Sequence, residues 1–89
     1  MHESIETYIY TDNLDAIIYK DGGMKLCIYN KHHSPYGWDK RNLICAHYGV
    51  KDEEFTWEYI KEKVDEVYST FPNRQIDELI TKIKNYKNG

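Results

Sequence analysis

A helical stripe in the carboxyl-terminal half of the chain constrains the fold more than any other feature of the sequence. Between Thr56 and Phe71 the apolar residues recur every three or four positions, as they do along one face of an α-helix. Thr56 is a good N-cap, with Asp52 as an alternative start, and Pro72 cannot continue a helix, so we predict a helix over 56–71. The stripe consists of Trp57, Ile60, Val64, Val67 and Phe71.

A second helix is predicted directly after the first, over 73–87. Asn73 is the expected N-cap, and three lysines near the far end suit the negative end of the helix dipole. Two helices joined by so short a connection form an αα-hairpin. The apolar stripe of this second helix consists of Ile76, Leu79, Ile80, Ile83 and Tyr86.

The amino-terminal half has the alternation and the β-branched and aromatic residues of strands. Residues 4–11 alternate well, and Asp21-Gly22-Gly23 between two apolar runs is typical of a β-hairpin. Residues 14–21 could instead form a short helix that Gly22 ends, but we favour the hairpin. Residues 43–50 fit either a strand, which we also favour, or a short helix ended by Gly49.

Strands followed by helices predict an α+β fold, in which helices pack on one face of an antiparallel sheet. We expect one domain over 1–89, with a small sheet of three to four strands in the β-rich part, residues 4–50, packed on the αα-hairpin. Within that part, Pro35 and Gly37 interrupt the pattern, so we predict a loop over 30–42. This loop carries His32, His33, Tyr36 and Trp38.

Negative charge is concentrated on the first predicted helix. The chain has a formal net charge of −3, and seven of its fifteen acidic residues lie between Asp52 and Glu66. Most of them fall opposite the apolar stripe, and we expect this acidic face to lack an internal partner. The alternative is an ordinary solvated face on which Lys61 and Lys63 compensate nearby acids. Because the sequence shows no basic face, we expect no direct binding of nucleic acid.

The residues that usually carry chemistry are present but not in a productive pattern. The four histidines and two cysteines lack the close pairs of a zinc site, and the chain has no phosphate-binding loop and no nucleophile elbow. Cys27 and Cys45 lie inside apolar segments, which predicts inert, buried thiols. Cys45 and His47 would share a strand face, so a thiol enzyme is a third and weaker hypothesis. We therefore expect no catalysis, no metal and no cofactor.

Two surfaces remain as candidates for binding a larger protein with a basic surface or groove. We expect a small cytoplasmic protein, without a membrane segment, that acts as an inhibitor or regulator. In the most concrete version of this hypothesis, the protein blocks a nucleic-acid-binding enzyme by mimicking nucleic acid, as small acidic proteins of phages and mobile elements do. The predicted contact residues are Glu54, Glu58, Glu62, Asp65 and Glu66 on the helix, and Tyr36 and Trp38 in the loop.

Three alternatives to this hypothesis stay open. Tyr36 and Trp38 could pack onto the core and leave the loop a plain connection. A small ligand or a metal could instead bind through the loop from His32 to Trp38, with His32, His33 and His47 as the ligand-binding residues and Tyr36 and Trp38 beside them. Nine tyrosines in 89 residues are also consistent with a homodimer, because tyrosine is enriched at protein interfaces.

Overall fold

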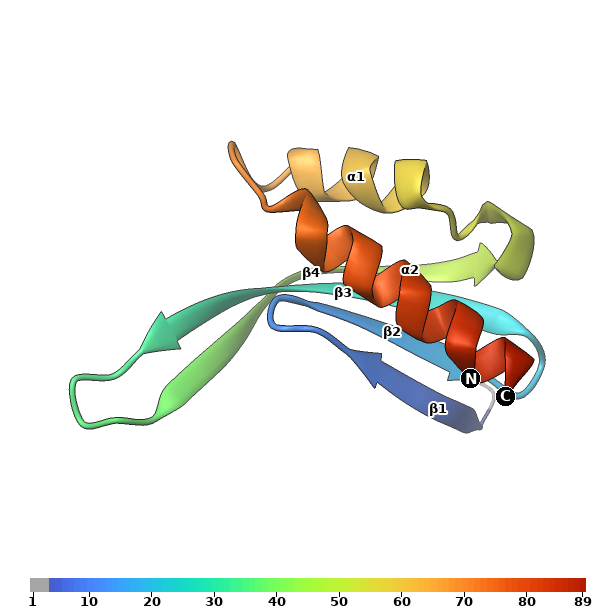
Figure 1. Ribbon diagram of the computed structural model, residues 1–89, viewed down its shortest axis with the longest axis horizontal. Coiled ribbons are helices and arrows are strands. Elements are labelled where there is room, and N and C mark those ends of the chain that lie inside the picture. The colour runs from blue at the N-terminus through green and yellow to red at the C-terminus, as the bar shows by residue number, and fades with distance from the viewer. Residues whose placement is uncertain (1–3) are drawn as a thin grey trace.

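The computed structural model describes residues 4–89, which form a four-stranded antiparallel sheet followed by two helices (Figure 1). The predicted α+β fold is confirmed. Each strand pairs with its neighbour in the sequence, so the spatial order is β1-β2-β3-β4. The elements are β1 (Ile5–Tyr10), β2 (Leu14–Tyr19), β3 (Gly23–His33), β4 (Asp39–Lys51), the 3₁₀ turn η1 (Asp52–Glu54), α1 (Trp57–Asp65) and α2 (Asn73–Asn88).

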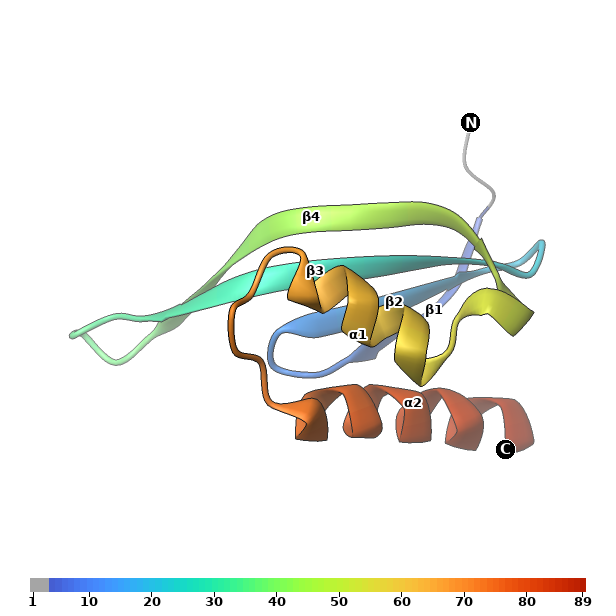
Figure 2. The same cartoon turned by 90° about the horizontal axis from the view of Figure 1, so that it is seen from above.

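Both helices lie on the same face of the sheet, which we call the inner face (Figure 2). Alternate strand residues such as Leu14, Ala16 and Ile18 point into the core, as the two-residue period of a strand requires. The apolar stripes of α1 and α2 pack against these strand residues. The largest fully buried side chains are Leu14, Met24, Leu26, Ile28, Ile60, Val64, Ile76 and Leu79.

The hairpin predicted around Asp21-Gly22-Gly23 is confirmed, and the helical alternative for residues 14–21 is wrong. Gly22 has a φ of +92°, a conformation that residues with a Cβ rarely adopt, and Asp21 Oδ1 accepts a hydrogen bond from the Gly23 N–H at 2.9 Å. The segment gave an ambiguous pattern because β2 is central in the sheet and buried on both faces, Asp15 and Ile17 included.

Strand β4 confirms the preference for a strand over residues 43–50, and two bulges explain its poor alternation. Cys45 pairs with Ile28 while Leu43 pairs with Tyr29, so Ile44 is an extra residue in the ladder. A second irregularity lies next to Gly49, which has a φ of +71°. Each bulge shifts the side chains that follow it to the other face, which blurs a period of two.

The loop predicted over 30–42 is wrong, because most of that segment is strand. The β3–β4 ladder continues from Asn30, paired with Asn42, to His33, paired with Asp39. Only a short turn at 34–38 joins the two strands. This part of the hairpin, which we call the arm, projects beyond the helices and gives the molecule extents of 41 × 27 × 25 Å (Figure 2). No helix covers the arm, so neither face of its strands needs apolar residues, and residues 30–33 and 39–42 are all polar.

Helix α1 is shorter than the predicted 56–71. Thr56 is its N-cap as expected, and its Oγ1 accepts a hydrogen bond from the Tyr59 N–H at 3.1 Å. The helix ends at Asp65, and Val67, which follows it, is 38% exposed rather than buried. Phe71 still reaches the core, but it does so from the connection rather than from the helix.

Helix α2 matches the predicted 73–87, although Pro72 rather than Asn73 occupies the N-cap position. Polar contacts attach this helix to the β1–β2 turn. Gln75 Oε1 accepts a hydrogen bond from the Asn13 N–H at 2.9 Å, and Gln75 Nε2 donates to Asn13 Oδ1 at 3.0 Å. Farther along, Lys82 Nζ donates to the carbonyl of Tyr10 at 2.8 Å. The sheet is therefore fixed to α2 at the edge formed by β1.

Candidate functional site

The acidic face of α1 lies on the solvent side of the helix. Glu58 and Glu62 stand one turn apart, both exposed, and neither forms an ion pair or a hydrogen bond with another residue in the 4–89 range. Their position follows from the stripe, because Ile60 and Val64 turn the opposite side of the helix into the core. The two carboxylates are thus held on a folded helix and remain available to a partner.

The remaining acids of this face are less available than the sequence suggests. Lys61 Nζ lies 3.0 Å from Asp65 Oδ1, and Lys63 Nζ lies 3.6 Å from Glu66 Oε2. The expectation that the acidic face lacks internal partners is therefore wrong at Asp65 and Glu66. Glu54 accepts a hydrogen bond from the Lys51 N–H at 3.2 Å, which uses one of its carboxylate oxygens. Glu58 and Glu62 remain as the open centre of the acidic face.

The two predicted aromatic contacts lie at the tip of the arm and point into solvent. Tyr36 is 87% exposed and Trp38 is 58% exposed, so the alternative in which they pack onto the core is wrong. The turn is ordered by its own hydrogen bonds. Ser34 Oγ accepts from the Tyr36 N–H at 3.0 Å, and the Ser34 N–H donates to the Trp38 carbonyl at 2.8 Å. Exposed large rings on a hydrogen-bonded turn are typical of contact residues.

The acidic face and the arm tip are separate surfaces. Figure 2 shows α1 over the body of the sheet, whereas the arm extends away from one end of that body. Within residues 4–89 no hydrogen bond or ring contact joins Tyr36 or Trp38 to α1. A partner protein would need a large contact surface to touch the acidic face and the arm tip at the same time.

The histidines predicted for the alternative ligand site are not gathered in one place. His33 Nδ1 lies 2.7 Å from Asp39 Oδ1 at the end of the arm, and this hydrogen bond lowers the pKa of the Asp39 carboxyl. His32 contacts the side-chain amide of Asn30. His47 pairs with Leu26 in the body, several ladder positions away. In the described part of the chain no three His, Cys, Asp or Glu side chains are grouped as metal ligands would be.

The structure does bring Cys45 and His47 together, with 3.6 Å between Cys45 Sγ and His47 Nε2. Burial, together with the charge of Glu66, raises the pKa of the Cys45 thiol, which opposes formation of the thiolate that a nucleophile requires. Cys27 is 2% exposed, and burial also raises the pKa of its thiol. The predicted buried thiol is thus found at Cys27, while Cys45 is half-buried.

A third surface was missed by the sequence reasoning. The face of the sheet turned away from the helices, which we call the outer face, carries exposed tyrosines from both edges of the sheet. The rings of Tyr8 and Tyr10 on β1 are parallel with centroids 6.0 Å apart, and the Lys25 ammonium lies 4.3 Å from the ring centroid of Tyr48 on β4. In the sequence, Tyr8 and Tyr10 are two residues apart, which places them on the same face of a strand. That spacing does not show which face of the sheet the helices cover.

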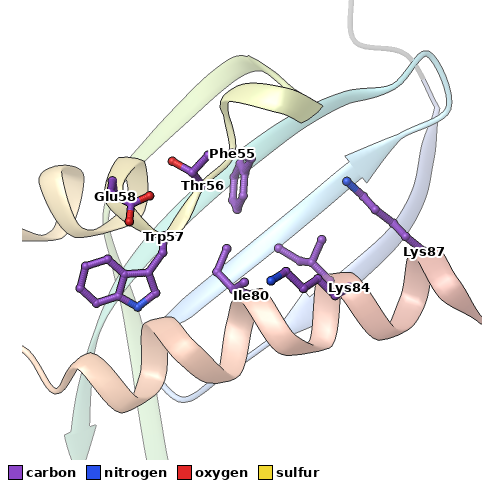
Figure 3. Close-up of a pocket in the computed structure, with 8 residues that line it drawn as sticks. Phe55, Thr56, Trp57, Glu58, Ile80, Lys84 and Lys87 are labelled. Carbon is purple, nitrogen blue, oxygen red and sulfur yellow. The ribbon is translucent and has the colours of Figure 1, made fainter.

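A groove between the start of α1 and the second half of α2 was also missed (Figure 3). It has a volume of about 340 Å³. Its floor is apolar, and two lysines of α2 stand at its rim, one of which, Lys87, forms an ion pair with Asp52. The lining residues are Phe55, Thr56, Trp57, Glu58, Ile80, Ile83, Lys84 and Lys87.

Comparison with known proteins adds no relative: no family model, no curated protein and no solved structure matches this chain. Neither α1 nor α2, nor any other helix within residues 4–89, has the length and apolar character needed to cross a membrane.

Proposed function

We propose that this protein is a small, non-catalytic binding module that docks on a larger protein with a basic surface or groove. The observation that carries the proposal is the pair of exposed carboxylates of Glu58 and Glu62 on α1, which have no ion-pair or hydrogen-bond partner among residues 4–89. Complementary charge accelerates encounter between proteins and selects among partners. The exposed rings of Tyr36 and Trp38 supply apolar contact area, which charge alone does not provide.

The most specific version of the proposal is inhibition of an enzyme that binds nucleic acid. A basic groove that binds phosphates would accept the two open carboxylates on α1, and the bound module would exclude the nucleic acid. The raised pKa of the Cys45 thiol and the dispersed histidines favour a binding role over a catalytic one. A phage or mobile-element origin would fit such an inhibitor.

The test is affinity capture from cells of the source organism with three forms of the chain. The first is the wild type, and the second is the charge reversal Glu58→Lys with Glu62→Lys. The third is a matched control, Asp12→Lys with Glu78→Lys, two exposed acids in weak surface pairs away from α1. Each double variant changes the net charge from −3 to +1, since each substitution adds two charges.

We expect the wild type and the control to retain one basic protein that the α1 variant loses, while all three forms melt within about 3 °C of one another, because exposed charges contribute little to stability. Binding of the recovered protein should weaken steeply as salt rises and should compete with nucleic acid. Equal recovery with both double variants would refute the role of the acidic face. Trp38→Ser with Tyr36→Ser tests the arm tip in the same way.

A further inference from the structure

The outer edge of β4 is the most open hydrogen-bonding surface of the protein. Over residues 4–89, β4 lies at the end of the sheet and pairs with β3 alone, so one side of its backbone faces solvent. An edge strand of this kind presents a row of N–H and C=O groups to which another strand can add. At 13 residues β4 is the longest strand of the sheet.

The two edges of the sheet differ in how they are protected. At the β1 edge, Lys82 Nζ donates to the carbonyl of Tyr10, and Tyr86 on α2 contacts the Glu6 carboxylate, so α2 covers that edge. Among the described residues, neither α1 nor α2 forms a hydrogen bond to the backbone of β4. The centre of β4, residues 43–48, contains no charged residue and no proline, two of the usual devices that discourage edge pairing; a third device, a β-bulge, is present at Ile44. Leu43 and Ile44 are 54% and 41% exposed there.

The charges at the two ends of β4 indicate what pairs with this edge. In a two-fold symmetric antiparallel pair, one residue lies opposite its own copy, and the other residues pair symmetrically about it. Centred on Cys45, the pairing places Asp39 opposite Lys51 of the second copy, at both ends. Centred one residue later, at Ala46, it would oppose Arg41 to Lys51, and like charges across a ladder are destabilising.

We propose that the β4 edge is the interface of a homodimer, in which two copies of this chain join antiparallel about Cys45 to form a continuous eight-stranded sheet. The uncharged segment of β4 then lies at the centre, and Asp39 and Lys51 form two ion pairs at the ends. This proposal concerns the β4 edge, whereas the docking proposal concerns Glu58 and Glu62 on α1, so each is tested by its own variants.

The first experiment measures the mass of the folded chain by light scattering across a concentration series. We expect a shift from 10.7 kDa toward twice that value. Ile44→Lys should raise the dimer dissociation constant at least about tenfold, because the two introduced ammonium groups would face each other diagonally within about 8 Å. Ile5→Lys is the matched control: Ile5 lies on the opposite edge strand and is 40% exposed, against 41% for Ile44.

The second experiment tests the register. Opposed residues in an antiparallel pair have Cα atoms about 4.5–5.5 Å apart, within the range that a disulfide spans. Diamide, which takes up two electrons and two protons, should therefore link two copies through Cys45. The link should survive Cys27→Ala and disappear in Cys45→Ala.

Each outcome decides for or against the proposal. A dimer that Ile44→Lys dissociates, that Ile5→Lys leaves intact and that oxidation links through Cys45 establishes it. A monomer at all concentrations overturns it, even if the edge binds a strand of another protein. A dimer lost only in Ile5→Lys, or one that diamide fails to link through Cys45, has a different interface and equally overturns it.

Discussion

The ion pair between Arg41 and Asp15 offers the sharpest test of how the sheet is held together. Asp15, on the central strand β2, is only 5% exposed, and Arg41 Nη2 on β4 donates to its Oδ1 at 2.7 Å. The guanidinium also lies 4.0 Å from the ring centroid of Tyr29 on β3. Arg41→Met removes the charge while keeping a stem that can cover the same ring.

The magnitude follows from the different burial of the two partners. Removing one partner of a fully buried ion pair costs about 3–5 kcal/mol, because the other charge is left without compensation. The Arg41 side chain is 32% exposed, so water can reach the vacated position and reduce the cost. We therefore expect Arg41→Met to lower the free energy of unfolding by about 2 kcal/mol. In a domain of this size that is a fall in Tm of about 8–16 °C.

The assay is urea denaturation of a double-mutant cycle, with Lys40→Met as the control for an exposed cation one residue away. Asp15→Asn combined with Arg41→Met should recover about 1 kcal/mol of the loss, because the neutral amide no longer leaves a buried charge. A loss below about 0.5 kcal/mol in Arg41→Met, or a strictly additive double variant, would show that the carboxylate does not depend on this pair.

Three further predictions follow from burial and charge. Leu79→Ala, at a fully buried position between α2 and the sheet, should cost about 3 kcal/mol in urea denaturation, whereas Leu43→Ala, at an exposed one, should cost less than about 0.5 kcal/mol. NMR titration should find the pKa of Asp39 below its usual range, and His33→Ala should raise it; the stabilisation from this contact is present above the unfolded-state pKa and is lost as the pH falls through the lower folded value. The Cys27 thiol should react with a thiol reagent about 100-fold more slowly than in the unfolded chain, because burial raises its pKa and opening must precede attack.

Each of the three has an outcome that contradicts it. Equal losses in the two leucine variants would mean that α2 is not packed as described. An Asp39 carboxyl that titrates identically with and without His33 would show that the hydrogen bond between these two side chains does not form in solution. Rapid modification of Cys27 in the native protein would show that the outer face opens far more readily than its burial implies.

The sequence was a good guide wherever an element has one buried and one exposed side. The stripe of Ile76, Leu79 and Ile83 located α2 closely, and Asp21-Gly22-Gly23 located the hairpin, because the turn requires the backbone freedom of glycine at Gly22. Both depend on short-range geometry. A pattern of period 3.6, or a turn with positive φ, is determined by neighbours in the chain.

The sequence failed where no such asymmetry exists. Strand β2 is buried on both faces, and the arm on neither, so residues 14–19 looked ambiguous and 30–42 looked like a loop. The candidate surfaces could be recognised from Glu58, Glu62 and Trp38, but the open β4 edge could not. Whether a strand is at an edge depends on which partners the whole chain supplies, and only the three-dimensional arrangement contains that information.

The order of the strands has a consequence for how the chain is made. β1 to β4 pair only with their neighbours, so the sheet can assemble from short loop closures as synthesis proceeds. Hydrogen bonds that hold α2 to the sheet, such as the one from the Asn13 N–H to Gln75, span 62 residues and form only after α2 has been synthesised. Until α2 emerges from the ribosome, side chains such as Leu14 have no helix above them. The nascent sheet therefore exposes apolar surface that chaperones can bind, and we expect that binding to end when Asn73–Asn88 packs on the sheet.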